Sequence, residues 1–203
     1  MYENFEKIVN NIPSLNTRRH AHLIYGLIRW LQPQVCVEIG SFAGYMTAWM
    51  LKALYDNGQT GVLHAIDNFT LGTSPSMLHN NMSQLGLANN LLIHDVSSEK
   101  FIFPGGINLA FVDGDHSFTG CQRDVHNCLT NGASTVIVHD TVGWWGPRDF
   151  IDNFRVVGLK FGNAYIPFDI IEDYFDSGLA VIKVRHEKPP VQYSKGDYPD
   201  GRI

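Results

Sequence analysis

Five short apolar segments alternate with segments of helical periodicity, and this alternation constrains the fold more than any other feature. The apolar segments are rich in Val, Ile and Leu. They span residues 35–39, 61–67, 90–95, 107–113 and 134–140. Strands that are buried on both faces read as nearly continuous apolar runs, and helical connections keep successive strands parallel. The sequence therefore predicts an α/β fold, with a doubly wound, mostly parallel sheet and helices on both faces.

Between and before these segments, apolar residues recur every three or four positions, which is typical of helices. The predicted helices span 18–31, 45–55, 76–85 and 119–131. Near the C-terminus, two strand-like runs within 165–184 are joined by DYFDSG, a spacing that favours an antiparallel hairpin. We expect one domain: a helical N-terminal segment at about 1–33, an α/β core at about 34–185, and a polar, proline-containing tail at 186–203 that forms an arm or is disordered.

Composition excludes several classes of protein. The net charge of −5, without a Lys/Arg cluster, argues against binding to nucleic acid. No run approaches the roughly 18 apolar residues of a membrane span, and the N-terminal residues do not resemble a secretory signal. The three cysteines are sparse and odd in number, as is common in a reducing compartment. We therefore expect a cytoplasmic protein that does not bind membranes.

Acidic residues end four of the five apolar segments. These residues are Asp67, Asp95, Asp113 and Asp140. A single Asp in such a place is commonly a helix cap or a turn residue. Four at one edge of a parallel sheet, with Glu38 close to it, favour a ligand site, because ligands of open α/β sheets bind outside the carboxyl ends of the strands.

The loop after the first apolar segment reads E-I-G-S-F-A-G from Glu38 to Gly44. Gly40 and Gly44 permit a sharp turn and close approach of a ligand, and the following helix begins with free amide groups. The spacing differs from the G-x-G-x-x-G dinucleotide fingerprint. Asp67 is either a turn residue or a bidentate acceptor for ribose hydroxyls, and we favour ribose.

Five stretches, taken in order, carry a family resemblance: VEIGSFAGYMT, HAIDNF, HDVSSE, NLAFVDGDHSFTGCQRDV and STVIVHDT. They resemble the motifs of class I S-adenosylmethionine-dependent methyltransferases, and most closely the small-molecule O-methyltransferases of the catechol and macrocin type. The resemblance covers about 35–184. It implies a Rossmann-like, seven-stranded sheet whose last strand is antiparallel.

The resemblance also implies roles for individual residues. The methionine part of S-adenosylmethionine would be lined by Glu38, Gly40, Ser41 and Gly44. Asp67 would hold the ribose, and Asp95 and Val96 would lie beside the adenine. The aromatic residue that stacks on the adenine is not evident from the motifs, and Phe69 and Trp144 are the candidates.

The DGDH stretch offers a base for the reaction. A hydroxyl group is a poor nucleophile at neutral pH and needs a base or a metal. Asp113 ends the fourth apolar segment, and His116 follows three residues later, where catechol-type relatives have a basic residue. We expect His116 to be the general base, with Asp113 beside it. The alternative is a loop histidine that bonds to the backbone or caps the next helix.

A divalent metal is the second way to activate the hydroxyl. Asp113, His139 and Asp140 match the positions of the metal ligands in metal-dependent relatives. Mg²⁺ prefers oxygen, so His139 favours Mn²⁺ or Zn²⁺ over Mg²⁺. The alternative is that Asp140 binds the acceptor or bonds to His116, with no metal.

The remaining polar and aromatic residues leave alternatives open. Trp144 and Trp145, in a glycine-bordered loop, form either a lid or wall for a planar or sugar-like acceptor or a hydrophobic plug on the core. Arg148 either binds an acidic acceptor or starts the next helix. The 18–31 helix either covers the site or forms a homodimer contact, and the other histidines, including His20, are interpreted as ordinary surface or boundary residues.

The favoured function is methyl transfer to a hydroxyl of a small molecule: a phenol, a sugar or a natural-product intermediate. The alternatives are a nicotinamide-dependent oxidoreductase, a cofactor-binding module without catalysis, and a fold recruited to another reaction such as hydroxylation.

Overall fold

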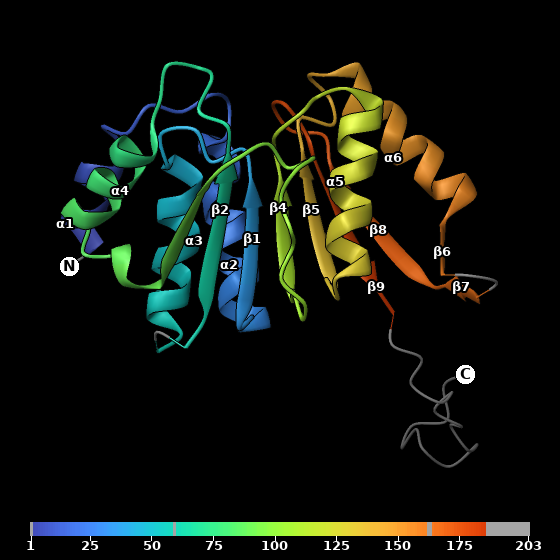
Figure 1. The fold of residues 1–203 in the computed structure, drawn as a ribbon, viewed down its shortest axis with the longest axis horizontal. Coiled ribbons are helices and arrows are strands. Elements are labelled where there is room, and N and C mark those ends of the chain that lie inside the picture. Colours follow the sequence, from blue (N-terminus) through green and yellow to red (C-terminus); the bar gives the residue numbers. More distant parts are fainter. Residues whose placement is uncertain (1, 59, 162–163, 186–203) are drawn as a thin grey trace, which may run out of the picture.

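The computed structural model describes residues 2–58, 60–161 and 164–185, and its centre is one seven-stranded sheet (Figure 1). The strand order is β3-β2-β1-β4-β5-β9-β8. The strands of this sheet are β1 (Val35–Ile39), β2 (Val62–Asp67), β3 (Leu91–Asp95), β4 (Leu109–Val112), β5 (Thr135–His139), β8 (Phe168–Asp173) and β9 (Leu179–Val184). The first five strands pair in parallel, and β9 runs antiparallel to both β5 and β8. The predicted sheet, with its antiparallel last strand, is confirmed.

Helices connect and cover these strands. They are α1 (Tyr2–Val9), α2 (Ala21–Leu31), α3 (Tyr45–Asp56), α4 (Pro75–Gln84), α5 (Phe118–Thr130) and α6 (Trp145–Val157), with short 3-10 turns η1 (Arg18–His20) and η2 (Ala88–Asn90). The side chain of Ser74 accepts a hydrogen bond from the amide of Met77 and so caps α4, and Ser117 caps α5 in the same way through Gly120. The cap at Ser117 fixes where α5 begins, immediately after the loop that carries His116.

Two hydrophobic cores lie on opposite faces of the sheet. The first contains buried side chains of α1, α2, α3 and α4, including Trp49 and Leu78, against strand residues such as Phe111. The second contains α5 and α6, including Val125 and Phe154, against the alternate residues of the strands. Figure 1 spreads the strands from left to right, with α3 and α4 toward the end of the sheet that carries β2 and α5 and α6 toward the end that carries β5 and β8. This alternation of inward-pointing residues is what two-sided burial of a parallel sheet requires.

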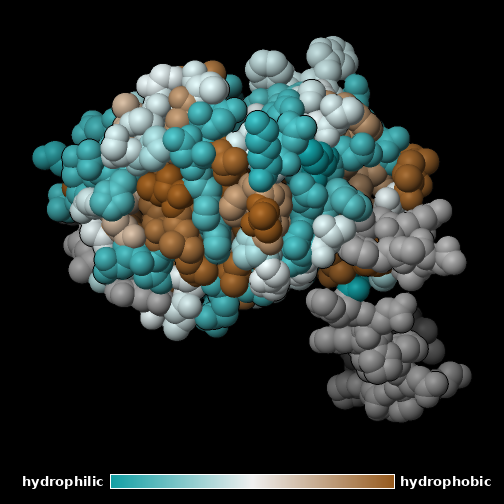
Figure 2. All heavy atoms as spheres, viewed as in Figure 1, coloured by the Kyte–Doolittle hydropathy of each residue, from teal (hydrophilic) through white to brown (hydrophobic). Residues whose placement is uncertain are grey.

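One crossover of the sheet lacks a helix. Residues 96–108, between β3 and β4, contain only turns and irregular backbone. Phe101 and Phe103 of this segment pack against the second core, while Ile102 is exposed. Figure 2 shows hydrophobic side chains among hydrophilic ones on the left and central parts of this view. The two phenylalanines of this segment cover part of the second core, and its first residues, 96–99, line the cavity described below.

Several boundaries differ from the sequence-based expectation. The predicted helix 18–31 is divided into η1 and α2, and Gln32 ends α2 in a left-handed conformation with φ of 48°. Helix α1 lies within the helical N-terminal segment expected at about 1–33, whereas the small hairpin of β6 (Leu159–Phe161) and β7 (Ala164–Ile166) was not expected. The predicted tail 186–203 lies outside the described residues. None of the helices in the described parts of the chain is long and apolar enough to cross a bilayer.

Candidate functional site

A cavity of about 690 Å³ opens at the carboxyl ends of the parallel strands. Loops after β1, β2, β3, β4 and β5 all contribute to its wall, and so does the segment 13–17 that precedes η1. The volume is within the range of pockets that hold drug-sized ligands and cofactors. Its position is the ligand crevice expected of an open α/β sheet.

Asp67 organises two of the loops that form this cavity. Its carboxylate accepts hydrogen bonds from the amides of Phe42, at 2.7 Å, and Phe69, at 2.6 Å. Both phenylalanines have left-handed backbones, with φ of 49° and 51°, which side chains with a Cβ rarely adopt. The carboxylate therefore offsets backbone strain in both loops, and it also lines the cavity. Each carboxylate oxygen has two lone pairs, so Asp67 can still accept hydrogen bonds from a ligand.

The two glycines of the first loop serve different purposes. Gly40 lines the cavity, and a Cβ there would lie 2.1 Å from the carbonyl oxygen of Asp113, so only glycine lets the loops after β1 and β4 meet. Gly44 lies outside the described lining. Its φ is +96°, and a Cβ would lie 2.3 Å from Leu78 and 3.0 Å from Met82 of α4. The second glycine therefore serves helix packing in this structure.

Glu38 and Ser41 are both buried beside the cavity. Glu38 is completely buried and lies outside the described lining; its Oε2 accepts a hydrogen bond from Thr47 Oγ1 at 2.6 Å. Burial raises the pKa of Glu38 to about 8, although the bond from Thr47 opposes the shift. Ser41 does line the cavity, and its buried Oγ has no hydrogen-bond partner among the described residues. An unsatisfied buried hydroxyl is costly unless a ligand or water completes it.

The two residues expected beside the adenine separate at the end of β3. Val96 lines the cavity, and its amide donates to the carbonyl of Asp67 at 3.0 Å. Asp95 is exposed and lies outside the described lining. Of the two aromatic candidates for stacking on the adenine, Trp144 lines the cavity and Phe69 packs against the first core.

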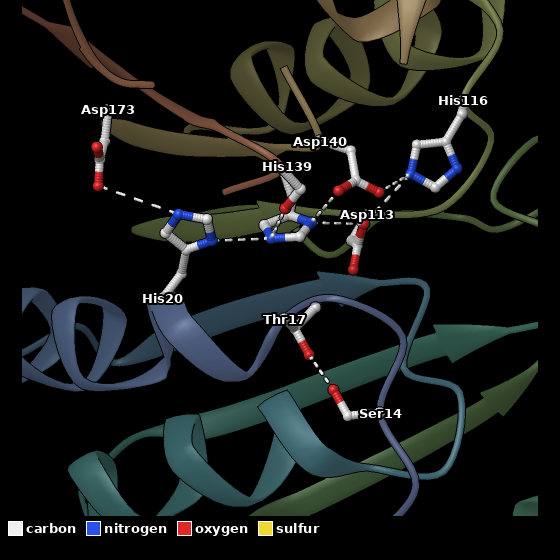
Figure 3. A network of polar contacts seen from close by, with 9 residues as sticks. Ser14, Thr17, His20, Asp113, His116, His139, Asp140 and Asp173 are labelled. Carbon is white, nitrogen blue, oxygen red and sulfur yellow. Dashed lines mark hydrogen bonds and ion pairs between the residues drawn. The ribbon is translucent and has the colours of Figure 1, made fainter. Parts of the chain in front are cut away.

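Two histidines and two aspartates form a compact cluster (Figure 3), in which Asp113, His116 and Asp140 line the cavity and His139 lies outside the described lining. His116 Nε2 lies 3.3 Å from Asp113 Oδ1 and 3.0 Å from Asp140 Oδ2. His139 Nδ1 lies 3.2 Å from Asp113 Oδ1 and 3.1 Å from Asp140 Oδ1. Figure 3 shows the carboxylates between the two imidazole rings. The ends of β4 and β5 thus bring together all four residues that the sequence selected for chemistry.

The charges of this cluster are strongly coupled. Burial disfavours the imidazolium of His116, but hydrogen bonds and charge from Asp113 and Asp140 outweigh burial and raise the pKa of His116 to about 9. The same balance raises the pKa of His139 to about 9. Burial opposes ionisation of Asp140, yet the bonds from both histidines hold its pKa well below the usual range. The cluster is therefore an ion-pair network at neutral pH.

Asp140 has an unusual backbone and an incompletely bonded side chain. Its φ is +59°, in the left-handed region, which Asp tolerates better than most residues. Its buried Oδ1 has no hydrogen bond of good geometry among the described residues. Ligand atoms of Asp113, His139 and Asp140 lie within 4.8 Å of one another. This set of donors fits a divalent cation of the kind that accepts both nitrogen and oxygen, such as Mn²⁺ or Zn²⁺.

The loop that carries the two tryptophans follows β5 and is largely exposed to solvent. Trp144 and Trp145 are 52% and 85% exposed, so the interpretation as a hydrophobic plug is wrong. Trp144 lines the cavity, whereas Trp145 starts α6. Arg148 lies within α6 and pairs with Asp152 and with Glu172, at 2.5 and 2.8 Å. Its charge is therefore already compensated within the protein.

The N-terminal segment contributes more than the sequence indicated. Residues 13–17 form one wall of the cavity, and Ser14 and Thr17 share a hydrogen bond of 2.8 Å that closes this turn (Figure 3). His20 is only 1% exposed and lies 3.0 Å from His139, so its interpretation as a surface or boundary residue is wrong. No local motif marks either feature, because both depend on contacts between segments far apart in the sequence.

Comparisons with known proteins agree with this architecture. Residues 37–141, which include most of β1, all of β2 to β5 and every residue of the histidine–aspartate cluster, match the family model described as a methyltransferase domain. No curated protein matches the sequence significantly.

Solved structures resemble the fold at low sequence identity. The SAH-bound methyltransferase PaMTH1 of Podospora anserina has a TM-score of 0.67 and 15% identity, covering 91% of this chain and 87% of that one. The O-methyltransferase TomG of Streptomyces achromogenes, in complex with SAM, has a TM-score of 0.64 and 18% identity, covering 91% and 90%. An O-methyltransferase of Bacillus cereus, in complex with SAH, has a TM-score of 0.65 and 13% identity, covering 90% and 91%.

Proposed function

Because this chain belongs to the methyltransferase domain family, we propose that it transfers a methyl group from S-adenosylmethionine to a hydroxyl oxygen of a small molecule. The observation that carries the proposal is the cavity, which joins Asp67 and Ser41 at one part of its wall to the histidine–aspartate cluster at another. One wall can therefore hold a nucleoside while the other acts on a second molecule. The structural neighbours whose titles name bound SAM or SAH support this assignment.

The residues of the cavity suit the parts of S-adenosylmethionine. Asp67 would accept the ribose hydroxyls, Val96 would lie by the adenine, and Gly40 and Ser41 would face the methionine part. The unpartnered Oγ of Ser41 gives that group a polar contact. Glu38, Gly44 and Asp95 remain predictions for cofactor binding, and any role of Glu38 or Gly44 from outside the lining is indirect. When bound, S-adenosylmethionine supplies an electrophilic methyl group to an oxygen nucleophile.

We propose His116 as the base that takes the proton of the acceptor hydroxyl, with Asp113 and Asp140 orienting its ring. In the geometry described, His116 is held as an imidazolium, so it must lose its proton before it can act. Orientation of the acceptor next to the base supplies a further part of the rate, because positioned reactants need no encounter step.

A divalent cation is the alternative activator, and Asp113, His139 and Asp140 would hold it. When bound, such an ion lowers the pKa of a coordinated hydroxyl. The protein's own contribution in that case is to neutralise the ion with two carboxylates and to keep the acceptor beside His116. Mixed nitrogen and oxygen donors favour Mn²⁺ or Zn²⁺ over Mg²⁺.

The acceptor is proposed to be a small molecule that packs on Trp144, with Leu15 and Leu71 as apolar parts of the same wall. A phenol, a sugar or a natural-product intermediate fits this description. The three cysteines are buried free thiols, which suits a cytoplasmic location. Homodimer formation also remains a proposal, with exposed Leu23 and Trp30 of α2 as the surface to examine.

The experiment that tests the function combines binding and transfer. Calorimetry should show binding of S-adenosylhomocysteine, and labelled S-adenosylmethionine should pass its methyl group to at least one compound in a panel of phenolic, glycosidic and amine acceptors. Asp67→Asn should weaken S-adenosylhomocysteine by about fivefold or more, because a charged hydrogen bond is worth more than about 1 kcal/mol. Asp169→Asn, an exposed acid on β8, is the matched control. Binding of NADH without any response to S-adenosylhomocysteine would reject the proposal in favour of an oxidoreductase.

A further inference from the structure

His20 lies beside the histidine–aspartate cluster, on the side of His139 that faces away from the two carboxylates. It comes from the last position of η1, in the N-terminal segment, and is 1% exposed. Its Nδ1 lies 3.0 Å from Nε2 of His139, and the two rings meet edge to face at 78°. Figure 3 shows the chain of contacts from His20 through His139 to the two carboxylates. His20 thus touches the cluster without lining the cavity.

A hydrogen bond between His20 Nδ1 and His139 Nε2 requires a proton on one of these nitrogens and a lone pair on the other. His139 Nδ1 faces Asp113 and Asp140, so this nitrogen serves the carboxylates or an ion bound between them. Its other nitrogen, Nε2, faces His20 Nδ1 and, at 3.3 Å, the hydroxyl of Ser177. An Nε2–H group on His139 would donate to a lone pair on His20 Nδ1, which leaves the proton of His20 on its own Nε2. That nitrogen lies 4.0 Å from Asp173.

We propose that His20 is a positioning residue, which holds His139 with Nε2 protonated and Nδ1 directed at Asp113 and Asp140. Histidines that ligate metals almost always donate their second nitrogen to a fixed acceptor, which sets the tautomer and the plane of the ring. The usual acceptor is a carboxylate or a carbonyl, and here it is a second imidazole. The expected effect on turnover rests on the proposed function. The expected hydrogen bond between His20 and His139 does not depend on it.

This contact connects two parts of the site. The turn that carries His20 follows directly after residues 13–17, which form a wall of the cavity. Thr17 is the residue before η1, and its carbonyl accepts a hydrogen bond from the amide of His20 at 3.2 Å. Residues 13–20 therefore both form a wall of the cavity and, in this proposal, orient His139 of the histidine–aspartate cluster.

Three variants separate positioning from stability. His20→Asn places an amide oxygen near the former Nδ1 and keeps an acceptor for His139. His20→Leu removes the acceptor and retains apolar volume. His22→Asn is the matched control, because His22 is exposed and its ring packs on Trp49, away from the cluster. Melting temperature and S-adenosylhomocysteine affinity are measured for each.

We expect His20→Leu to lower kcat about tenfold or more, in line with other residues that orient a metal ligand, with S-adenosylhomocysteine affinity within about twofold of wild type. His20→Asn should restore most of kcat, and His22→Asn should behave as wild type. Equal losses in His20→Leu and His20→Asn, in parallel with losses in melting temperature, would overturn the proposal in favour of a packing role. Unchanged kcat in His20→Leu would overturn it as well.

Nuclear magnetic resonance of wild-type protein labelled with ¹⁵N-histidine tests the contact independently of activity. We expect one proton on Nε2 of His139 and another on Nε2 of His20. We also expect a scalar coupling across the hydrogen bond between His139 Nε2 and His20 Nδ1. A proton on His20 Nδ1, or no coupling, would overturn the positioning role even in an active enzyme. The coupling without any methyl transfer would instead support the contact and reject the proposed function.

Discussion

The imidazole of His116 stacks on the indole of Trp144, with ring centroids 5.0 Å apart and 17° between their planes. Trp144 is half exposed and lines the cavity, so its other parts are available to a second molecule. The stacking holds His116 at the boundary between the buried cluster and the cavity. The indole therefore has two functions in this proposal: it fixes the plane of the base and it forms a wall for the acceptor.

Replacement of Trp144 by alanine should raise KM for the acceptor by about fivefold or more, because a stacked aromatic pair and apolar burial each contribute on the order of 1 kcal/mol. Affinity for S-adenosylhomocysteine should change less. Initial rates at varied acceptor concentration, together with calorimetry, measure both effects. Trp30→Ala is the control, since Trp30 is an exposed tryptophan on α2. Equal effects in the two variants would remove Trp144 from the acceptor site.

The pH dependence of kcat should rise through alkaline pH. Asp113 and Asp140 raise the pKa of His116 to about 9 against the effect of burial, so the neutral imidazole that acts as base becomes populated only as pH approaches 9. kcat measured between pH 6 and 10 should therefore increase toward a plateau. His116→Gln should lose about a hundredfold or more of kcat, the usual contribution of a general base, and should lose this pH dependence. A plateau already reached at pH 7, retained in His116→Gln, would exclude His116 as the base.

Removal of divalent metals distinguishes the two ways of activating the hydroxyl. If Asp113, His139 and Asp140 hold an ion, protein treated with EDTA should lose activity and regain it with Mn²⁺ or Zn²⁺ more than with Mg²⁺. Asp140→Asn should then lower the content of bound metal in elemental analysis. Full activity of protein that contains no metal would leave His116 as the activator.

Gly44 should be far less tolerant of substitution than Gly58. Both glycines have φ of +96° and flank α3, but a Cβ at Gly44 meets Leu78 and Met82, whereas nothing lies within 4 Å at Gly58. The left-handed backbone costs an alanine about 1–2 kcal/mol at either position, and overpacking adds about 1–3 kcal/mol at Gly44. Urea unfolding of Gly44→Ala and Gly58→Ala should show this difference in the free energy of unfolding. Equal destabilisation would mean that α4 moves to make room for the new methyl group.

The strands and the main helices could be predicted because they depend on local patterns. β1, β4 and β5 are buried on both faces, so their sequences contain little but apolar residues. Helix α1 is short and carries only one stripe of apolar residues, which include Phe5 and Val9. It lies within the helical segment expected at about 1–33, but so short a helix depends on packing, and the contact of Phe5 with Trp49 of α3 could not be predicted from local spacing.

The site was predictable where it follows from strand ends. Asp67, Asp113 and Asp140 sit at the carboxyl ends of parallel strands, and topology brings such residues to one edge whatever the other details are. His20 and residues 13–17 reach the same edge through tertiary contacts. His20 contacts His139, which lies 119 residues later in the sequence. Spacing within a sequence carries no information about such a contact, and so this part of the site emerged only from the structure.

The separation between His20 and His139 also has a consequence for biosynthesis. His20 leaves the ribosome 119 residues before its partner, and at about 5–20 residues per second this interval is on the order of ten seconds. During that time the wall formed by residues 13–17 has no completed sheet edge to rest on. A nascent chain therefore closes this cavity only after β5 has been translated, however early the first residues of its wall are made.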